Sequence, residues 1–497
     1  MRYIYLPYSV NSPAKLLSGF DSGGKLSLAL EIRFCPESPE VVFSYPVGEE
    51  ILRFELDGKE FLPQSGSEPL SRSFSEPYPR PRLSFSPELG WLNDPNGLFY
   101  LNGLWHMFFQ HNPVGTVWGN MHWGHAVSEN LVSWKEVGIA LFPDDFGTMF
   151  SGSAIVDTEN ASGLGTAENP AVLLFYTAAG GDDVRSRGKA YTQCLAYSTD
   201  EGKTFKKYAG NPIIPPLCQH SRDPKVVRDG RGGYYLALYL DDQEHSYLLF
   251  ASRDLIHWEK IQTLSLSKDS ECPDFYPLGL NGSTKWVYSG ASDFYAVGDV
   301  ENGLFRFDSI RRLQSSDAGY AAQTWSDAPG GRRVKVWWNR WCGIPEKGPR
   351  RCSMSAPCDV SLVRINGAPR LSAEICPEIF AAFPQKCEYG SLSGKTEIPC
   401  SPTCAVKLRS EDPSSPFSLL LNGVSVDFDG RFLFVSGRKY ETDVPPGEVT
   451  VLFDGLNFQL HACRGTLCLI TAAVPGKSGL VLSLPENIRA KLTLFRF

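Results

Sequence analysis

The sequence predicts an all-β protein, and three observations lead to this fold class. Aromatic side chains are plentiful, with 11 Trp, 20 Tyr and 30 Phe, and these residues favour pleated strands. Glycine (46) and proline (36) are also frequent, which supplies the turns that join short strands. Short apolar runs such as VLLFYTA, YYLALYL and SYLLFA recur, whereas the 3.6-residue period of a helix is nearly absent.

The N-terminal part is expected to be a separate small module. A chain of 497 residues is long enough for two or three domains. Residues 1–78 alternate apolar and polar side chains in EILRFELDGKEF, with a turn signal at Asp57-Gly58, and therefore predict a β module. The proline-rich stretch Ser75–Pro87 predicts a linker.

The rest of the chain divides into three further parts. Residues 79–370 are a long succession of short strand patterns. The stretch SAEICPEIFAAFPQK predicts a short helix and a connector, which we place at 371–385. Alternation in SPFSLLLNGVSVDF and AKLTLFRF predicts a C-terminal β-sandwich over 386–497.

A weak repeat gives the middle part an architecture. Ala126–Glu136, Ala196–Lys207 and Ala251–Lys260 each end a strand with Ser, place Asp or Asn after one intervening residue, and add an aromatic residue four or five positions later. A strand, a polar hairpin and a returning strand with an aromatic side chain produce this pattern. Units that recur with insertions between them are typical of propeller blades, although hairpins can also resemble one another by chance.

Composition excludes several classes of partner. The net charge is −7 and the Lys and Arg residues are scattered, so nothing indicates nucleic acid or an acidic membrane surface. No run approaches the roughly 18 apolar residues of a membrane span. The N-terminus, MRYIYLPYSVNSPAK, lacks the apolar core of a secretory signal, so we expect a cytoplasmic protein, with export by another route left open. Thirteen irregularly spaced cysteines then predict reduced thiols.

We expect neither a metal nor a cofactor. Cys400, Cys404, Cys463 and Cys468 imitate a zinc site, but their spacings are loose. Half of the eight histidines cluster at His106, His111, His122 and His125 without an accepted metal-binding spacing, which favours a polar pocket or core lining. The sequence has no Walker loop, no strand-anchored GxGxxG and no GxSxG elbow, so nucleotide, hydride-transfer and serine-esterase chemistry have no support.

Three carboxylates stand out among the 55 acidic residues. Asp94 lies in WLNDPNG, Asp223 in SRDPK and Glu271 in ECPDFY, each next to or two residues from a proline that stiffens the backbone. A turn cap or an ion pair explains each acid alone. Together, in a strand-rich region with many aromatic residues, they indicate preorganised carboxylates for acid–base or nucleophilic chemistry.

A pair of carboxyl groups can hydrolyse a glycosidic bond, one as acid and the other as nucleophile or base. The weakly polar neighbours Cys272 and Pro273 favour a protonated Glu271, which suits the acid. Amide neighbours and turn donors favour an ionised Asp94, which suits a nucleophile. Asp223, paired with Arg222, is expected to stay ionised and bind sugar hydroxyls. Further candidates are flat rings and hydroxyl-binding side chains: Trp118, Trp123, Trp286, Trp338, Gln110, Asn112 and Ser151.

The motifs WLNDPNG, FQHNP, WGNMHWGHAVSENLVSW, FSGSAIVD, RDPKV and ECPDFY occur in the order seen in glycoside hydrolase family 32, and the chain resembles that family over about residues 83–370. The resemblance implies a five-bladed β-propeller followed by a β-sandwich. It also implies that Asp94 is the nucleophile, Glu271 the acid/base and Asp223 the transition-state stabiliser beside Arg222. The remaining implied positions line the fructose subsite or follow the acid/base: Asn93, Gln110, Trp118, Phe150, Ser151 and Cys272.

Three segments depart from the family pattern: Ser315–Trp325 is short, Val336–Trp341 reads VWWNRW, and Ala356-Pro357-Cys358-Asp359 replaces Leu-Pro-Arg-Glu. They leave open the pocket wall, including Trp338 and the placement of Asp317 and Tyr320. The resemblance implies a retaining exo-acting β-fructofuranosidase that takes sucrose, fructo-oligosaccharides, inulin or levan. Alternatives are a fructosyltransferase, an inverting arabinosidase or xylosidase, and an inactive carbohydrate-binding relative; a homo-oligomer is compatible with the sequence.

Overall fold

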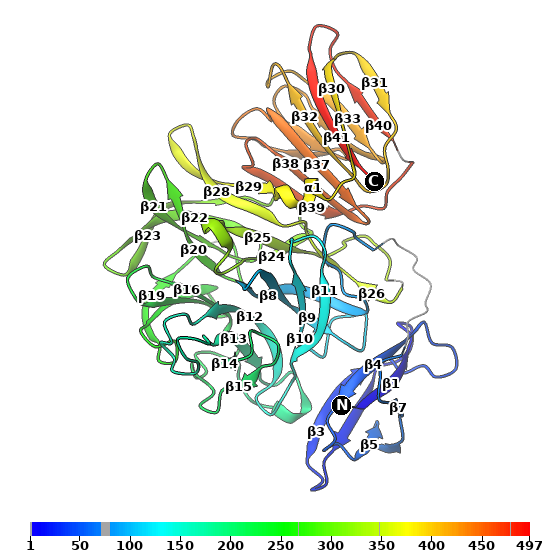
Figure 1. Cartoon of the computed structure of the whole chain (residues 1–497), viewed down its shortest axis with the longest axis vertical. Coiled ribbons are helices and arrows are strands. Elements are labelled where there is room, and N and C mark those ends of the chain that lie inside the picture. Colours follow the sequence, from blue (N-terminus) through cyan, green and yellow to red (C-terminus); the bar gives the residue numbers. More distant parts are fainter. Residues whose placement is uncertain (1, 71–79, 267, 347, 478) are drawn as a thin grey trace.

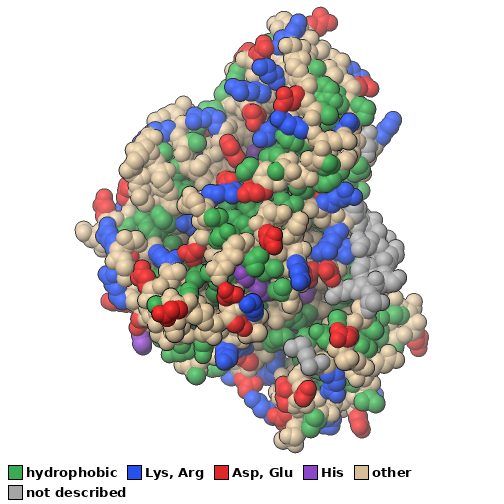
Figure 2. All heavy atoms as spheres, viewed as in Figure 1, with side chains coloured by type: hydrophobic (Ala, Val, Ile, Leu, Met, Phe, Trp, Pro, Cys, Tyr) green, Lys and Arg blue, Asp and Glu red, His purple; other side chains and the backbone are tan. Residues whose placement is uncertain are grey.

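The computed structural model of the chain describes residues 2–70, 80–266, 268–346, 348–477 and 479–497, and nearly all regular structure in them is β-strand. Figure 1 shows three bodies: a small N-terminal module, a large central body and a C-terminal sandwich at the opposite end of the molecule from the module. Acidic and basic side chains are interspersed over the face shown in Figure 2. The prediction of an all-β protein is confirmed.

The N-terminal module consists of two small sheets packed face to face. One has the order β4-β1-β7 and the other β3-β2-β5-β6. Its apolar core comes from alternation, as in β4, where Val41, Phe43, Tyr45 and Val47 are buried and the residues between them are not. The strands are β1 (Arg2–Tyr8), β2 (Lys15–Phe20), β3 (Leu26–Ile32), β4 (Val41–Val47), β5 (Arg53–Leu56), β6 (Lys59–Phe61) and β7 (Gln64–Gly66).

The central body is a five-bladed β-propeller. Each blade is an antiparallel sheet whose first strand contacts the first strand of the next blade, and the ring closes because β24 contacts β8. With strands given from the axis outward, the first blade contains β8 (Gly90–Leu101), β9 (Leu104–Asn112), β10 (His122–Ser128) and β11 (Lys135–Leu141), and the second contains β12 (Thr148–Val156), β13 (Val172–Ala179), β14 (Thr192–Ser198) and β15 (Lys206–Lys207). The third blade contains β16 (Arg222–Arg228), β17 (Tyr234–Leu240), β18 (Ser246–Ser252) and β19 (Glu259–Leu264), and the fourth contains β20 (Asp274–Leu280), β21 (Ser283–Ser289), β22 (Phe294–Glu301) and β23 (Leu304–Arg312). The fifth blade contains β24 (Gly319–Thr324), β25 (Val334–Asn339), β28 (Cys358–Ile365) and β29 (Ala368–Ile375). Two short strands extend these sheets: β26 (Arg350–Arg351) pairs with β8 of the first blade, and β27 (Ser353–Met354) pairs with β25 of the fifth. The two 3-10 turns in the described residues are η1 (Val184–Ser186) and η2 (Pro329–Gly331).

The sequence repeat is the outer hairpin of three successive blades, β10–β11, β14–β15 and β18–β19. The serine that ends the third strand bonds to the Asp or Asn two positions later, as between Ser198 Oγ and Asp200 Oδ1 at 2.6 Å. The aromatic residue then packs into an apolar cluster, as Trp258 does beside Phe175 of the neighbouring blade. The interpretation of the repeat as propeller blades is therefore confirmed.

The C-terminal body is a sandwich of two six-stranded sheets. The five-residue helix α1 (Pro377–Ala381) precedes it, after the last propeller strand ends at Ile375. One sheet contains β30 (Gln385–Leu392), β41 (Ala490–Arg496), β32 (Cys404–Ser410), β37 (Glu448–Asp454), β38 (Asn457–Ala462) and β39 (Leu467–Ala472). The other contains β31 (Lys395–Ile398), β40 (Leu480–Ser483), β33 (Phe417–Leu421), β34 (Val424–Phe428), β35 (Leu433–Val435) and β36 (Arg438–Tyr440).

The predicted linker differs from the structure where it is described. Its first part, and with it the proposed boundary at residues 78 and 79, lies outside the described residues. The described part, residues 80–87, is a buried strap instead of an exposed connector, because Leu83 and Phe85 pack into the core between propeller and sandwich. Buried Asp454 of β37 accepts hydrogen bonds from the amides of Arg82 and Leu83 at 2.7 and 2.8 Å. The divisions at 370 and 385 stay proposals.

Candidate active site

The three predicted carboxylates converge at one end of the propeller axis. Asp94 lies near the start of β8, Asp223 near the start of β16, and Glu271 three residues before β20. The first strands of the blades form the ring around the axis, so residues near their N-terminal ends meet at one mouth. Direct contacts place the acids together, because the Cys272 thiol lies 3.5 Å from Oδ2 of both Asp94 and Asp223.

Bulges in the inner strands aim these side chains. The pairing of β8 with β9 shifts between Leu92 and Pro95, and the pairing of β16 with β17 shifts between Arg222 and Lys225. Each shift contains an Asp-Pro pair. Proline cannot donate to the ladder and is tolerated at a bulge, where the local bend re-aims the preceding side chain. Asp223 has the left-handed conformation at φ 67°, which is backbone strain held at the mouth.

Asp94 is half-buried and hydrogen-bonded. Ser151 of β12 donates its hydroxyl to Oδ2 of Asp94 at 2.6 Å. Burial raises the pKa of Asp94, while the donors Ser151, Asn93 and Cys272 lower it. The donors that the sequence predicted are present, but the net shift of the pKa is upward because desolvation outweighs them.

Asp223 is held from two sides. The backbone amide of Cys272 donates to its Oδ2 at 2.9 Å, and the amide of Asp223 donates to the Thr177 hydroxyl at 2.9 Å. Burial raises the pKa of Asp223 to about 7; the Arg222 charge opposes this, and the carboxylates of Asp94 and Glu271 add to it. The predicted pairing with Arg222 is loose, because Arg222 Nε lies 3.9 Å from Asp223 Oδ2.

Arg222 instead contacts Glu271. Its Nη2 donates to Glu271 Oε1 at 2.7 Å, and its Nη1 donates to Asp241 Oδ2 at 3.1 Å. Tyr320 donates its hydroxyl to Glu271 Oε2 at 2.7 Å. The Glu271 side chain is 33% exposed, and beyond its weakly polar sequence neighbours its carboxylate faces a cation and a phenol at the edge of solvent.

Cys272 separates the acids from one another. It follows Glu271, and both residues are left-handed, at φ 38° and 58°. Burial raises the pKa of the Cys272 thiol well above its usual value, and the nearby carboxylates of Asp223 and Asp94 raise it further. Cys272 is therefore a neutral thiol against two carboxylates.

The structure brings the other predicted wall residues to this mouth in different ways. Phe150 precedes Ser151 in β12 and has T-shaped contacts with Trp118 at 6.0 Å and with Tyr191 at 5.3 Å. Trp118 is 54% exposed, so its ring is available to a ligand. Asn93 is buried and accepts a hydrogen bond from the Trp91 indole at 2.9 Å.

Gln110 is buried and donates to the Met149 carbonyl at 2.8 Å. On the opposite wall, Trp338 packs edge-on against Tyr320 with ring centroids 6.3 Å apart, and the Arg340 guanidinium lies 4.5 Å from the Tyr320 ring. Tyr320, which the sequence left open, therefore reaches the site. Asp317 does not bind there: it pairs with Arg438 of the sandwich at 2.9 Å.

Three sequence-based candidates are wrong. Trp123 and Trp286 are buried in apolar clusters and offer no free ring face. Asn112 is also buried, and its amide accepts from the Val114 amide and donates to the Val117 carbonyl, so it braces the loop after β9. Burial depends on neighbouring blades, and a single strand motif does not reveal it.

Several side chains around the acids escaped the sequence analysis. Asp241 holds Arg222, Thr177 supports Asp223 and bonds to Gln193 at 2.8 Å, and Tyr247 donates to the Glu271 carbonyl at 3.2 Å. Thr177 and Tyr247 lie within apolar strand patterns, where the available signal was only a polar group in an otherwise buried run.

The histidine cluster is core lining with internal hydrogen bonds. His106 Nδ1 lies 3.1 Å from His125 Nε2, and His122 Nε2 lies 2.9 Å from the Tyr45 hydroxyl. Burial lowers the pKa of His106 to about 4 and that of His122 to about 3. Within the described ranges, no group of three or more His, Cys, Asp or Glu residues is placed to hold a metal ion. All thirteen cysteines are free thiols.

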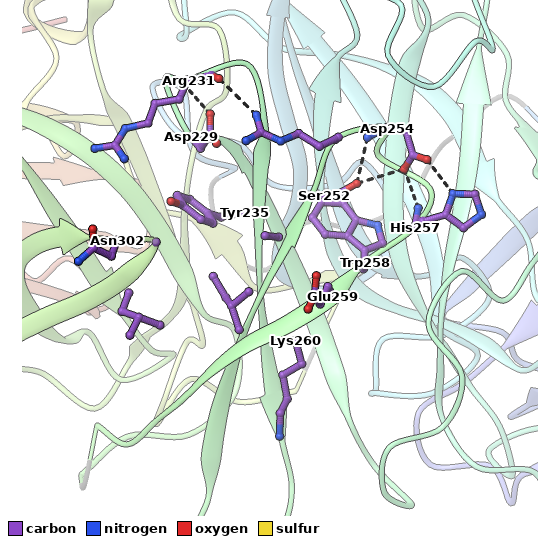
Figure 3. A pocket seen from close by; sticks show the side chains of 15 residues that line it. Asp229, Arg231, Tyr235, Ser252, Asp254, His257, Trp258, Glu259, Lys260 and Asn302 are labelled. Carbon is purple, nitrogen blue, oxygen red and sulfur yellow. Dashed lines mark hydrogen bonds and ion pairs between the residues drawn. The ribbon is translucent and has the colours of Figure 1, made fainter.

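A hollow of about 960 Å³ lies on the outer rim of the propeller, away from the three acids (Figure 3). Two of its carboxylates have structural partners: Asp229 accepts from the amides of Arg231 and Gly233, and Asp254 from those of Ile256 and His257. These are turn caps, so the hollow is no second catalytic centre. In the part of the chain that the structure describes, no helix is long and apolar enough to cross a bilayer.

Fold and site together define a class: a five-bladed propeller whose inner strands bring carboxyl groups together in the arrangement that glycoside hydrolysis uses. Residues 84–366 match the family described as "Glycosyl hydrolases family 32 N-terminal domain". The chain belongs to glycosyl hydrolase family 32.

The chain is 36% identical over 322 residues to a levanase of Bacillus subtilis, covering 59% of this chain and 46% of that protein. It is 38% identical over 222 residues to an invertase of Schizosaccharomyces pombe, covering 42% and 37%. The matches therefore span less than half of these two relatives. Its fold is similar to the exo-inulinase structure from Aspergillus awamori, with a TM-score of 0.74 at 25% identity over 84% of this chain and 99% of that one. The predicted propeller and sandwich are confirmed.

Proposed function

We propose that the protein is a retaining exo-acting β-fructofuranosidase that releases terminal fructose from β-D-fructofuranosides. The observation that carries the proposal is the convergence of Asp94, Asp223 and Glu271, with one thiol in contact with two of them and Arg222 bound to the third. Relatives named levanase, invertase and exo-inulinase support a substrate with a terminal fructose unit.

In the first step, an Asp94 oxygen attacks the anomeric carbon of fructose and the bond to the leaving oxygen breaks. Glu271 gives its proton to that oxygen. Ser151 holds the attacking carboxylate in one orientation, since its hydroxyl is only 2.6 Å from Oδ2. Arg222 and Tyr320 hold both oxygens of Glu271, which fixes the direction of the proton transfer.

In the second step, Glu271 takes a proton from water while that water attacks the same carbon, and the bond to Asp94 breaks. Fructose leaves with its configuration retained. Ionised Asp223 binds the fructose hydroxyls as positive charge develops on the ring. Its amide contacts with Thr177 and Cys272 keep the carboxylate in place through both steps.

The test of the roles is Asp94→Asn and Glu271→Gln, assayed for fructose release from sucrose. Each is expected to lose at least about 10³-fold in kcat, as removal of a nucleophile or an acid does. Glu259→Gln on the outer rim is the matched control, since this glutamate is exposed and far from the axis mouth, and it is expected to keep wild-type activity. Near wild-type fructose release by either site variant refutes the role assigned to that residue, whereas no fructose release by the wild-type protein favours the inactive carbohydrate-binding relative.

Stereochemistry and products separate the remaining alternatives. NMR of the first-formed anomer is expected to show retention, and inversion refutes the double displacement. A panel of sucrose, raffinose, kestose, inulin and levan is expected to give free fructose only; released oligomers refute exo action. Incubation at high sucrose is expected to give hydrolysis, and fructose-extended oligosaccharides as the main products favour a fructosyltransferase.

A further inference from the structure

The loop between β9 and β10, residues 113–121, carries Trp118 and lies against the N-terminal module. The Trp118 ring packs edge-on against Phe150, and more than half of its surface is exposed. The position of Trp118 must therefore be fixed by contacts of the loop that carries it. The contacts of the loop show what does so.

The N-terminal module holds the first half of the loop through apolar packing and hydrogen bonds. Val114 is fully buried in the apolar core of the module, together with Ile4, Leu6 and Tyr8. The Tyr8 hydroxyl lies 3.0 Å from Thr116 Oγ1 and accepts a hydrogen bond from the Thr116 amide at 3.2 Å. A propeller side chain thus completes the core of the module.

The N-terminal module also holds the second half of the loop, through hydrogen bonds between Glu31 and Asn120. The Asn120 side chain accepts from the Glu31 amide at 2.8 Å and donates to the Glu31 carbonyl at 2.7 Å, as a neighbouring strand would. Asn120 is left-handed at φ 46°, and Gly119 before it has φ 148°, a conformation that favours glycine. Trp118 therefore lies between two anchored loop residues, Thr116 and Asn120, whose partners Tyr8 and Glu31 both belong to the N-terminal module.

The other side of the loop faces the catalytic residues. Trp118 contacts Phe150, the next residue is Ser151, and Ser151 bonds to Asp94. The backbone of Phe150 is fixed, because the buried Trp123 indole donates to its carbonyl at 2.9 Å. Of the two contacting rings, Phe150 is anchored by the propeller, and Trp118 lies on a loop that the module holds together with Asn112 at the end of β9.

We propose that the N-terminal module is a positioning element of the active site: through Tyr8 and Glu31 it holds the 113–121 loop so that Trp118 presents its ring to the bound sugar. This rests on the proposed function, since it assigns Trp118 to the binding of the terminal fructosyl substrate. Tyr8 and Asn120 act through Trp118 and do not touch the sugar. Loss of the anchors frees a loop, which raises the entropy that substrate binding must overcome and leaves the chemical groups intact.

The experiment is a double-mutant cycle with sucrose as substrate. Asn120→Gly keeps the left-handed backbone and removes both bonds to Glu31 together with the bond to Asn112, whereas Tyr8→Phe removes only a contact of the module, the hydroxyl bonded to Thr116. Each is expected to raise KM by about 3- to 10-fold with kcat within about twofold, the effect of losing one or two neutral hydrogen bonds. Trp118→Ala is expected to raise KM more. In the Trp118→Ala background neither anchor variant is expected to raise KM further, because the ring it positions is gone.

Lys25→Ala is the control, because it breaks an exposed ion pair with Asp145 at the same junction without touching the loop. It is expected to leave KM unchanged. Equal KM increments with and without Trp118 overturn the proposal, as does a wild-type KM in both anchor variants. If Asn120→Gly fails to fold, Tyr8→Phe decides the question.

Hydrogen–deuterium exchange of residues 113–121 gives a second readout that needs no substrate. Faster exchange in both anchor variants, and not in Lys25→Ala, supports the proposal, and unchanged exchange overturns it. Failure of the proposed function looks different: the wild-type protein then releases no fructose from any of the sugars in the panel, while the exchange measurement still decides whether the module holds the loop.

Discussion

Replacement of Arg222 by glutamine tests the electrostatics of the site. Arg222 is the cation beside Asp223 and Glu271, and its side chain is largely buried. Burial has already raised the pKa of Asp223 to about 7, and Arg222 is the strongest opposing influence. Arg222→Gln removes that charge while it keeps a hydrogen-bonding side chain of similar reach. The pKa of Asp223 is therefore expected to rise.

The size of the shift follows from the geometry. At the 3.9 Å between Arg222 Nε and Asp223 Oδ2, two unit charges interact by about 4 kcal/mol with an effective dielectric constant of roughly 20. One pKa unit corresponds to about 1.4 kcal/mol, so about 3 units is the upper bound. The guanidinium charge is shared with Glu271 and Asp241, which places the expected shift at about 1–3 units, the usual range for an Asp beside an Arg.

The assay is kcat/KM for sucrose as a function of pH. Under the proposed mechanism Asp223 must be ionised to bind the fructosyl ring, so activity is lost as the pH falls through its pKa, and a higher pKa moves this acid limb to higher pH. The carboxylate of Asp94 raises the pKa of Asp223, so the limb reports the pair. Arg222→Lys keeps a positive charge and is expected to hold the limb within about one unit of wild type. If the acid limb of the kcat/KM profile of Arg222→Gln lies at the same pH as in the wild type, the reasoning is refuted.

Three further substitutions test other contacts. Ser151→Ala removes the hydroxyl that donates to Asp94 at 2.6 Å and is expected to raise the pKa of that carboxyl further. We expect kcat/KM to be about 10- to 100-fold lower on the acid side of the pH profile. An unchanged pH profile contradicts this expectation. Tyr320→Phe removes the phenol from Glu271 Oε2 and is expected to lower kcat about 10-fold with KM for sucrose nearly unchanged, and steady-state kinetics with a wild-type kcat argue against a role for this hydroxyl. Asp454→Ala leaves the buried amides of Arg82 and Leu83 without an acceptor and is expected to lower the free energy of unfolding by about 2–5 kcal/mol in urea titrations, with Asp454→Asn less affected; equal midpoints for Asp454→Ala and wild type contradict the strap.

Sequence reasoning located the acids because their signals are local. An Asp-Pro pair inside a strand pattern marks a bulge, since proline has no amide proton for the ladder, and both Asp94 and Asp223 lie in bulges of inner strands. The hairpin repeat was equally local, because a serine, an acid or amide, and an aromatic residue satisfy one turn and one packing site. Local signals of this kind can be recognised in the sequence without knowing which residues the neighbouring blade contributes.

Burial was the part that local patterns did not contain. Trp118 and Trp123 are five residues apart and equally aromatic, yet Trp123 fills the space between two blades and Trp118 projects from a loop. The same limit affected Glu271. Its sequence neighbours are weakly polar, but its spatial neighbours are Arg222 and Tyr320, which lie 49 residues away on either side.

Under the proposed function, the two sides of the scissile bond depend on different parts of the chain. The fructose side is built by propeller strands near the axis, with Ser151 on Asp94 and Thr177 on Asp223. Beside Glu271, where the leaving group must lie, Tyr320 contacts Arg340, and Arg340 bonds to the carbonyl of Asp317, which pairs with Arg438 in the sandwich. With the N-terminal module holding the loop of Trp118, both flanking domains reach the rim of the site. Under this proposal, changes in the sandwich can alter leaving-group preference and changes in the module can alter binding of the terminal fructosyl unit, while the three carboxylates stay the same.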